Sequence, residues 1–260
     1  MQNELKILDD IAKKYLISDP RIVGGIPRDY ALNGYGSISF KDIDITTNSD
    51  EVLRLAVLFA KRMGVGHKIF ADGHASVFLG DGIFDFSSRF ISDSAVKYCR
   101  NELKIFDESL YESFSRDFTI NSLEVDLYLN KILDPTSLGL NDVELKVVRP
   151  ITTASICISD DPRRAFRAIK LSSKYGLEID EGIYNFVRSN KDIFKPSNGR
   201  VKSSYISEII NSSIEFDADK TFNNILKMKL LFSIPLTGKF KDWLIDNKML
   251  DFYFKSLDLE

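Results

Sequence analysis

The alternation of acidic and apolar residues in Asp42-Ile43-Asp44-Ile45 constrains the fold more than any other feature of this 260-residue chain. Side chains alternate between the two faces of a β-strand, so Asp42 and Asp44 should share one face while the isoleucines enter a core. At about 3.3 Å per residue, the two carboxylates lie roughly 7 Å apart at the backbone. They can then converge on one metal ion or bridge two ions held about 3.5 to 4 Å apart.

A glycine-rich turn precedes this acidic strand. Gly24 and Gly25 allow positive φ and close approach of a ligand, and Pro27 suits the first turn of a helix whose free N–H groups would face an anion. The alternative is an ordinary strand-to-helix turn followed by a solvated Arg28 and Asp29. The order and closeness of turn and strand favour a phosphate cradle that faces metal-binding carboxylates, which is the chemistry of nucleotidyl transfer.

Composition describes an ordinary globular protein of one large or two small domains, with 44% hydrophobic and 28% charged residues. Apolar runs are too short for a membrane span, and residues 1–16 alternate charges with apolar residues as an amphipathic helix does. We therefore expect a cytoplasmic protein without membrane contact. Cys99 and Cys157, with His67 and His74, form neither a disulfide framework nor a zinc spacing, so buried thiols are expected.

The net charge of −3 hides an asymmetry between the two halves. Residues 1–150 contain 18 basic and 23 acidic side chains, whereas residues 151–260 contain 17 and 15. If the substrate is a polyanion, the second half is the better candidate to hold its backbone.

The first half should mix strands with helices, and the second should be almost all helical. A helix is predicted over residues 50–63, capped by Asn48 or Ser49 and closed at Gly64. Residues 88–112 are less regular and predict a mobile connection. Three strands are also predicted: residues 75–79 and 83–87, joined through Gly80-Asp81-Gly82, and residues 131–133 before the turn Asp134-Pro135.

Two further blocks contain candidate site residues. Asp85, between Phe84 and Phe86, is placed either as a third carboxylate beside the acidic pair or as an exposed acid on a half-buried strand. Later in the chain a charge pair and an amide stand on neighbouring turns anchored by apolar residues. These polar residues are Arg116, Asp117 and Asn121, and their anchors are Phe118, Ile120 and Leu123.

The last block runs from Asp160 to Lys170. Asp161 precedes a proline suited to the first helical position, which predicts an N-cap. On the same helix, Asp161, Arg164 and Arg167 span about 120° of the circumference. One acceptor and two guanidinium donors on one edge can match the hydrogen-bonding edge of a base. The stripe of Arg163, Arg167, Lys170 and Lys174 would meet phosphates or merely solvate the helix.

Taken together, these blocks resemble the class II tRNA nucleotidyltransferases of the polymerase beta superfamily, which comprise CCA-adding enzymes and bacterial poly(A) polymerases. Six motifs of that family have counterparts here in the same order. They are G-G-x-V-R-D at residues 24–29, D-x-D at 42–44, H-G-T-V at 74–77, an acidic strand followed by Arg at 85–89, R-R-D-F-T-I-N-A at 115–122 and E-D-x-x-R-x-x-R at 160–167.

The resemblance implies an α+β fold with a nucleotidyltransferase head of small mixed sheet and flanking helices over residues 1–150. An all-α neck and shortened body would follow over residues 151–260. It implies Mg²⁺ at Asp42 and Asp44, base recognition by Asp161, Arg164 and Arg167, and CTP and ATP as substrates with the tRNA 3′ end. The remaining implied nucleotide contacts are Gly24, Gly25, Arg28, Asp29, Arg89, Arg116, Asp117 and Asn121.

The expected activity is addition or repair of the 3′-terminal CCA of tRNA. Poly(A) tailing, addition of CC only and addition of the terminal A only use the same chemistry. A nucleotidyltransferase acting on a small molecule or protein and a non-catalytic RNA-binding relative are the other classes. The chain departs from the family at Pro27, Ala75 and Ser115. We also expect the helical body and tail of the family to be shortened or missing after about residue 240. If the shortened body binds RNA weakly, a second subunit of a homodimer would supply further RNA contacts.

Overall fold

The computed structural model describes residues 2–38, 40–47, 51–71, 73–87 and 90–257. The chain divides into two compact units, residues 1–144 and 145–260, and each is described by itself. The predicted domain boundary after residue 150 stays a prediction. So do the predicted roles, catalysis for residues 1–150 and base recognition with RNA binding for residues 151–260.

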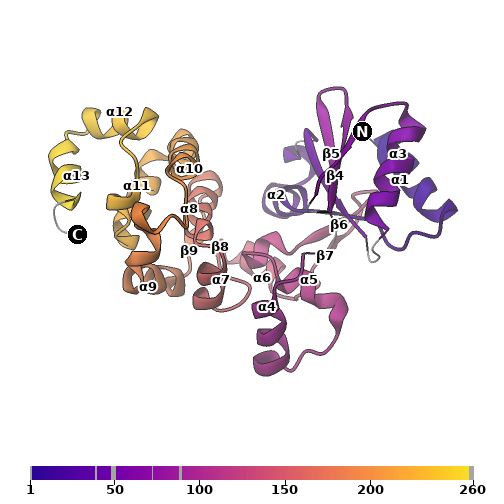
Figure 1. The fold of residues 1–260 in the computed structure, drawn as a ribbon, viewed down its shortest axis with the longest axis horizontal. Coiled ribbons are helices and arrows are strands. Elements are labelled where there is room, and N and C mark those ends of the chain that lie inside the picture. The colour runs from indigo at the N-terminus through magenta and orange to yellow at the C-terminus, as the bar shows by residue number, and fades with distance from the viewer. Residues whose placement is uncertain (1, 39, 48–50, 72, 88–89, 258–260) are drawn as a thin grey trace. The chain divides into compact units, whose positions relative to one another are not determined.

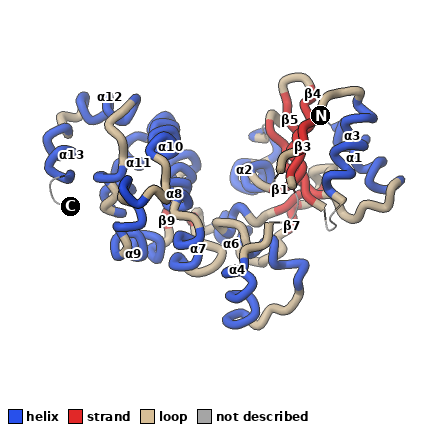
Figure 2. Tube along the Cα trace, in the orientation of Figure 1, coloured by secondary structure: helices blue, strands red, loops and turns tan. Residues whose placement is uncertain are grey.

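Unit 1 is built on one mixed sheet of seven strands (Figure 2). Strands β2 and β5 are parallel neighbours, and all other neighbouring pairs are antiparallel. The strand predicted at Asp42 and the hairpin predicted across Gly80 are both present. In spatial order the strands are β3 (His67–Ile69), β4 (His74–Leu79), β5 (Gly82–Ser87), β2 (Asp42–Thr46), β1 (Arg21–Val23), β6 (Glu124–Asp126) and β7 (Ile132–Leu133).

Helices α1 (Gln2–Lys14) and α3 (Val52–Met63) cover one face of this sheet, while α2 (Gly25–Asn33) lies on the other side (Figure 1). The apolar residues of β2, Ile43 and Ile45, are fully buried against α1 and α3. Burial of this face fixes the register of β2, because a slip by one residue would bring its aspartates into the core. The opposite, polar face of the sheet is thereby left for the acidic residues.

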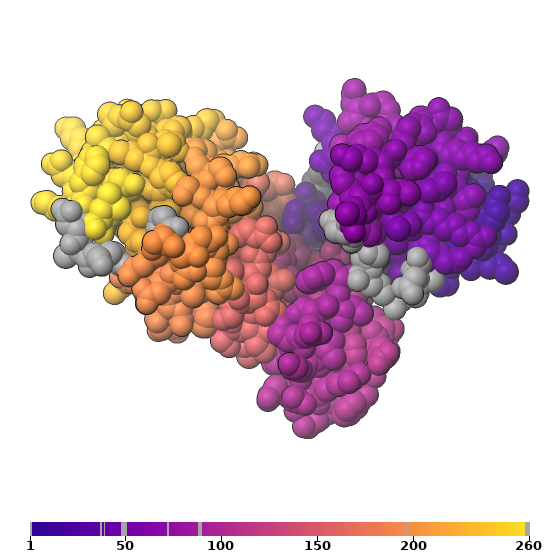
Figure 3. Space-filling model, in the orientation of Figure 1, coloured from indigo at the N-terminus to yellow at the C-terminus, as the bar shows by residue number. Residues whose placement is uncertain are grey.

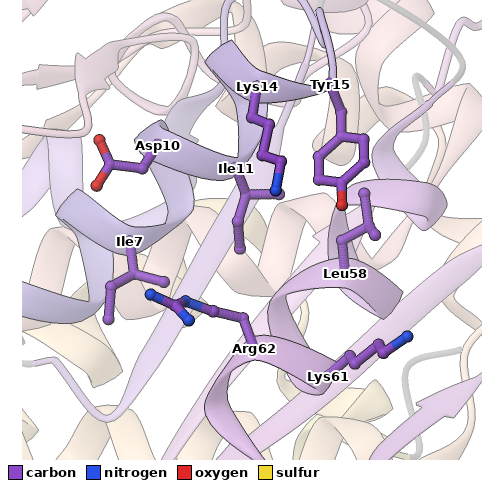
Figure 4. Close-up of a pocket in the computed structure, with 8 residues that line it drawn as sticks. All are labelled: Ile7, Asp10, Ile11, Lys14, Tyr15, Leu58, Lys61 and Arg62. Atoms are coloured by element: carbon purple, nitrogen blue, oxygen red, sulfur yellow. The ribbon is translucent and has the colours of Figure 1, made fainter.

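Helix α3 ends as predicted at Gly64, which is left-handed with φ of 69°. It begins at Val52 rather than at residue 50, and the predicted caps Asn48 and Ser49 lie outside the described residues. Between α1 and α3, on the side of the helices away from the polar sheet face, lies a groove of about 490 Å³ (Figure 4). Its lining consists of Ile7, Asp10, Ile11, Lys14, Tyr15, Leu58, Lys61 and Arg62.

The prediction of an irregular connection over residues 88–112 was wrong for its described part, which is largely helical. The segment bulges from unit 1 in the space-filling view (Figure 3) and buries Ala95, Cys99 and Tyr111. Ala95 and Cys99 lie four residues apart, so one face of the helical stretch carries both of these buried side chains. The elements from here to the end of unit 1 are α4 (Asp93–Tyr98), the π-helical turn η2 (Cys99–Leu103), η3 (Glu108–Leu110), α5 (Tyr111–Phe114), η4 (Thr119–Asn121) and α6 (Gly139–Glu144).

Unit 2 is helical, as predicted, apart from one small parallel pair, β8 (Val147–Val148) with β9 (Glu178–Ile179), that the sequence did not indicate (Figure 2). Its helices pack around a shared core that includes Phe166 and Ile210. The α+β class predicted for the whole chain is therefore confirmed. The helices are α7 (Ala154–Asp160), α8 (Arg163–Tyr175), α9 (Glu181–Ser189), α10 (Ser203–Phe216), α11 (Ala218–Met228), α12 (Gly238–Asp246) and α13 (Leu250–Leu257).

Within the described ranges, no helix has both the length and the apolar character needed to cross a bilayer. Cys99 and Cys157 are both buried and no disulfide joins them, which confirms the expectation of buried thiols.

Candidate active site

Three carboxylates gather on the polar face of the unit 1 sheet. Asp42 and Asp44 share this face, because the intervening Ile43 points into the core. Asp85 on β5 stands directly opposite Asp44 in the parallel β2–β5 pair. Residues in register on neighbouring strands point to the same face, so Asp85 takes the position of a third carboxylate beside the pair.

Asp85 is held in place by Ser76 of β4. Ser76 is in register with Asp85 across the β4–β5 hairpin, and its hydroxyl donates a hydrogen bond to Oδ1 of Asp85. The serine is almost fully buried, whereas Asp85 itself is partly exposed. One oxygen of Asp85 is therefore held by the sheet.

On the other side of β2, Asp44 lies against the glycine turn. Gly24 caps α2 with φ of 76°, a conformation that favours glycine, and an added Cβ there would collide with the Asp44 carboxylate. The helix begins at Gly25, and Pro27 lies in its first turn as predicted. The turn thus brings the N-terminus of α2 directly beside one carboxylate of the cluster.

The predicted polar residues of unit 1 form a connected chain beside this turn. Arg28 donates two hydrogen bonds to Asp29 Oδ1, at 3.0 and 2.7 Å, and one to Asn121 Oδ1 at 3.0 Å. Asn121 Nδ2 donates in turn to Asp117 Oδ1 at 2.8 Å. Arg28 and Asp29 are only 14% and 19% exposed, so they form a partly buried network rather than a solvated pair.

Arg116 approaches the cluster from the end of β2. It donates a hydrogen bond of 3.2 Å to Glu112, which also accepts one of 3.4 Å from Thr46 at the end of β2. The predicted apolar anchors Phe118, Ile120 and Leu123 are fully buried beneath this segment. Glu112 was not predicted as a site residue.

The electrostatic environment of Asp44 reflects the crowding of carboxylates. Burial raises the pKa of Asp44 above its ordinary value, and the negative charges of Asp85 and Asp42 raise it further. The positive charges of Arg116 and Arg28 act in the opposite direction. Both arginines therefore lie within electrostatic reach of the carboxylates, and a cation bound there would relieve their mutual repulsion.

This donor set fits a hard divalent cation. Within the described ranges no three His, Cys, Asp or Glu side chains are grouped as a complete metal site. Mg²⁺ usually binds proteins through only one or two carboxylates and takes its other ligands from water and substrate phosphates. Asp42 and Asp44, beside a helix N-terminus suited to phosphate, supply that kind of partial site.

In unit 2, Asp161 lies between α7 and α8 and joins two of the predicted arginines. Its Oδ1 accepts hydrogen bonds from the backbone N–H of Arg163 at 3.0 Å and from Nε of Arg163 at 2.8 Å. Its Oδ2 accepts a bond of 2.9 Å from Arg167. Burial alone would raise the pKa of Asp161, but the hydrogen bonds from Arg163 and the charge of Arg167 hold it below its ordinary value.

The side chain of Arg164 binds a different partner from that of Arg167. Its Nη1 donates to the backbone carbonyl of Cys157 at 3.2 Å, which ties α8 to α7. The prediction that Asp161 is the N-cap of α8 was wrong, because the helix begins at Arg163 and Pro162 takes the N-cap position. Asp161 instead lies one residue further out and accepts from the backbone N–H of Arg163. The structure thus joins Asp161 to Arg167 directly and links Arg164 to the preceding helix.

One predicted site residue, Arg89, lies outside the described residues. Sequence reasoning missed the contact of Ser76 with Asp85, although a signal existed. The turn between Leu79 and Gly82 fixes the register of the hairpin, and counting back from it pairs residue 76 with residue 85. Glu112 had no such signal, because its contact with Thr46 joins segments far apart in the sequence.

Comparisons with known proteins agree with this architecture. A family model described as the poly A polymerase head domain matches residues 20–149. A CCA-adding enzyme of Staphylococcus aureus (strain MRSA252) is 25% identical over 217 residues, which cover 82% of this chain and 50% of that protein. A CCA-adding enzyme of Lactobacillus helveticus (strain DPC 4571) is 27% identical over 176 residues, covering 66% and 41%. The chain spans about half the length of these curated relatives.

Solved structures show the same fold. A tRNA nucleotidyltransferase complexed with a primer tRNA and an incoming ATP analog has a TM-score of 0.69 at 20% identity, covering 97% of this chain and 71% of that one. A tRNA-processing enzyme with CTP has a TM-score of 0.67 at 23% identity, covering 87% and 57%. The resemblance inferred from the sequence motifs is thereby confirmed, and this chain belongs to the poly A polymerase head domain family.

Proposed function

We propose that the protein is a template-independent RNA nucleotidyltransferase that adds or repairs the 3′-terminal CCA of tRNA from CTP and ATP. The observation that supports this most strongly is the acidic pair Asp42 and Asp44 on one sheet face, directly beside the Gly24 turn. The related CCA-adding enzymes and the likeness to a tRNA nucleotidyltransferase bound to primer tRNA support the choice of substrate.

In the proposed reaction, the RNA 3′-hydroxyl attacks the α-phosphorus of the nucleotide and pyrophosphate leaves. Asp42 and Asp44 would hold a Mg²⁺ ion, whose chemistry would be to lower the pKa of the attacking hydroxyl and to neutralise charge on the leaving group. Asp85, fixed by Ser76, faces the same space and would accept the hydroxyl proton. These three carboxylates are the proposed catalytic residues.

Other residues of unit 1 would hold the triphosphate. Gly24 and Gly25 present the N-terminus of α2 to a phosphate, and the guanidinium of Arg28 is positioned by Asp29 and Asn121. Asp117 orients the amide of Asn121. Arg116, and by the family resemblance Arg89, would balance the remaining negative charge.

Unit 2 would read the incoming base. A carboxylate acceptor and guanidinium donors can match the edges of cytosine and adenine. Asp161 and Arg167 are already joined by a hydrogen bond of 2.9 Å, which holds both groups in a defined geometry. The protein itself would then take the place of a template. A cytoplasmic location and a homodimer stay predictions.

Nucleotide incorporation tests the proposed function. Transcripts of tRNA that end before, within and after CCA are incubated with each labelled nucleotide in turn. We expect C to be added to the shortest transcript, A to the transcript ending in CC, and no addition to the complete one. Absence of C and A incorporation into every transcript would overturn the proposal.

The same products separate the alternatives. Continued addition of A beyond the complete CCA end would identify a poly(A) polymerase, and arrest after CC or dependence on a preformed CC end would identify a partial enzyme. A nucleotidyltransferase acting on a small molecule or protein would ignore RNA altogether. The base-reading role proposed for Asp161 and Arg167, which are joined by a hydrogen bond, argues against that class.

Replacing Asp161 should change nucleotide choice more than stability. In Asp161→Ala, we expect the preference in kcat/KM for CTP over UTP to fall by about 10-fold or more, because loss of one base-reading pair costs about 1–3 kcal/mol. Asp217→Ala is the matched control, since Asp217 caps α11 by accepting from the backbone N–H of Lys220 at 2.8 Å. Equal loss of preference in both variants, or none in Asp161→Ala, would contradict the assignment.

A further inference from the structure

Arg163 is a basic residue of unit 2 to which the proposed chemistry gives no role. It stands at a position that the motif E-D-x-x-R-x-x-R leaves open, in a stripe of basic residues expected either to meet phosphates or to solvate the helix. In the structure its guanidinium binds Asp161, one of the proposed base-reading residues, in the turn before α8. Its contact is therefore with the carboxylate that would read the base.

The hydrogen bonds to Asp161 are divided unequally between its two oxygens. Oδ1 accepts two bonds from Arg163, one from the backbone N–H at 3.0 Å and one from Nε at 2.8 Å. Oδ2 accepts a bond of 2.9 Å from Arg167. Each carboxylate oxygen has about two acceptor positions. Arg163 thus fills Oδ1, and the contacts among the described residues leave one acceptor position on Oδ2.

A ring on a neighbouring helix supports the side chain of Arg163. Tyr205 lies in the first turn of α10 and is half-buried, and the guanidinium carbon of Arg163 lies 5.9 Å from the centroid of its ring. A guanidinium over an aromatic face is attracted by the ring quadrupole. Burial raises the pKa of Tyr205, while the positive charges of Arg167 and Arg163 act in the opposite direction. Both arginines that bind Asp161 therefore lie within electrostatic reach of this tyrosine.

The remaining acceptor position on Oδ2 matters for the choice of base. The N4 amino group of cytosine and the N6 amino group of adenine are donors, whereas a carbonyl oxygen occupies the corresponding place in uracil and guanine. A carbonyl set against Oδ2 would leave two acceptors facing each other without a donor, which is costly in a desolvated site. This discrimination requires that the carboxylate of Asp161 keep one orientation, and the two bonds from Arg163 oppose its rotation.

We propose that Arg163 is a positioning residue for nucleotide choice: it holds Oδ1 of Asp161, so that Oδ2 and Arg167 face the incoming base. The ring of Tyr205 keeps the guanidinium of Arg163 in place. The proposal rests on the base-reading role proposed above and adds a residue that acts through Asp161 rather than through a phosphate of the RNA.

Nucleotide choice in single and double variants tests Arg163. In Arg163→Ala we expect the preference in kcat/KM for CTP over UTP to fall about 3- to 10-fold, as removal of one hydrogen bond predicts. In Asp161→Ala/Arg163→Ala the preference should equal that of Asp161→Ala alone, because coupled residues are not additive. The KM for RNA should change less than about twofold, since a residue that binds no phosphate releases no counterion.

Arg163→Lys separates the geometry of the side chain from its charge. Lysine keeps the positive charge but lacks both the Nε donor and the planar guanidinium, so the preference for CTP should fall as in Arg163→Ala. Arg188→Ala is the matched control, because Arg188 is another partly exposed arginine of unit 2 and pairs with Glu181 at 2.6 Å on α9. The control should keep the wild-type preference.

Four results would overturn the role of Arg163 while leaving the proposed function intact. They are an unchanged preference in Arg163→Ala, full preference in Arg163→Lys, an equal loss in Arg188→Ala, and effects of Asp161→Ala and Arg163→Ala that multiply in the double variant. A protein that adds neither C nor A to any RNA would overturn the proposed function and the role of Arg163 together.

Discussion

Replacing Asp44 by asparagine should lower kcat for nucleotide addition by about 10²- to 10³-fold, the usual cost of removing one preorganised electrostatic group. Asn is nearly isosteric with Asp but lacks the charge that would hold a divalent cation, and Asp44 is in register with the adjacent Asp85. The affinity for RNA should change less than about twofold, because the cation acts mainly on the transition state. Single-turnover addition of C, measured beside RNA binding, checks both expectations.

Asp10→Asn serves as the matched control for the loss of one negative charge. Asp10 lines the groove between α1 and α3, which cover the opposite face of the sheet. The control should keep wild-type turnover. Full activity in Asp44→Asn, or an equal loss in both variants, would refute the assignment of Asp44 to the catalytic cluster.

Replacing Gly24 by alanine should be the next most damaging change, with a fall in kcat of about 10²-fold. The new Cβ would collide with the Asp44 carboxylate, and a displacement of about 1 Å at a reacting centre can cost that much. The backbone at Gly24 also has φ of 76°, which disfavours any residue with a side chain. Thermal unfolding of the variant, measured beside its kinetics, records the strain separately.

Gly34→Ala is the control for the stability cost of placing a side chain at a positive φ. Gly34 has φ of 79°, close to that of Gly24, but an added Cβ there would meet no atom within 4 Å. Both variants should lose about 1–3 kcal/mol of stability from the backbone conformation, and Gly24→Ala should lose more because its Cβ also collides with Asp44. Only Gly24→Ala should lose turnover. If the two variants fall in activity together, the close approach of Gly24 to Asp44 has no role in the site.

The parts of the site that could be predicted from sequence depend on local periodicity. The shared face of Asp42 and Asp44 follows from the alternation of side chains along one strand, and the first turn of α2 follows from Gly24 and Pro27. The pairing of Asp85 with Asp44 could only be offered as an alternative, since strand order depends on how the chain crosses over through α3.

Contacts between distant segments could not be predicted from the sequence either, because they too depend on how the whole chain folds. The hydrogen bond from Arg28 to Asn121 spans 93 residues, and nothing in either motif specifies the other as its partner. The helical segment after β5 was misjudged because its helices are short and interrupted by the π-helical turn η2, which blurs the 3.6-residue repeat.

Anomalous diffraction from crystals grown with Mn²⁺ and a non-hydrolysable CTP analogue tests the central claim most directly. The account predicts a peak within about 2.0–2.3 Å of carboxylate oxygens from both Asp42 and Asp44, with nucleotide phosphate oxygens completing the coordination. It also predicts that the peak disappears in Asp42→Asn/Asp44→Asn. A nucleotide bound without metal at these carboxylates, or a peak that survives the double substitution, would contradict it.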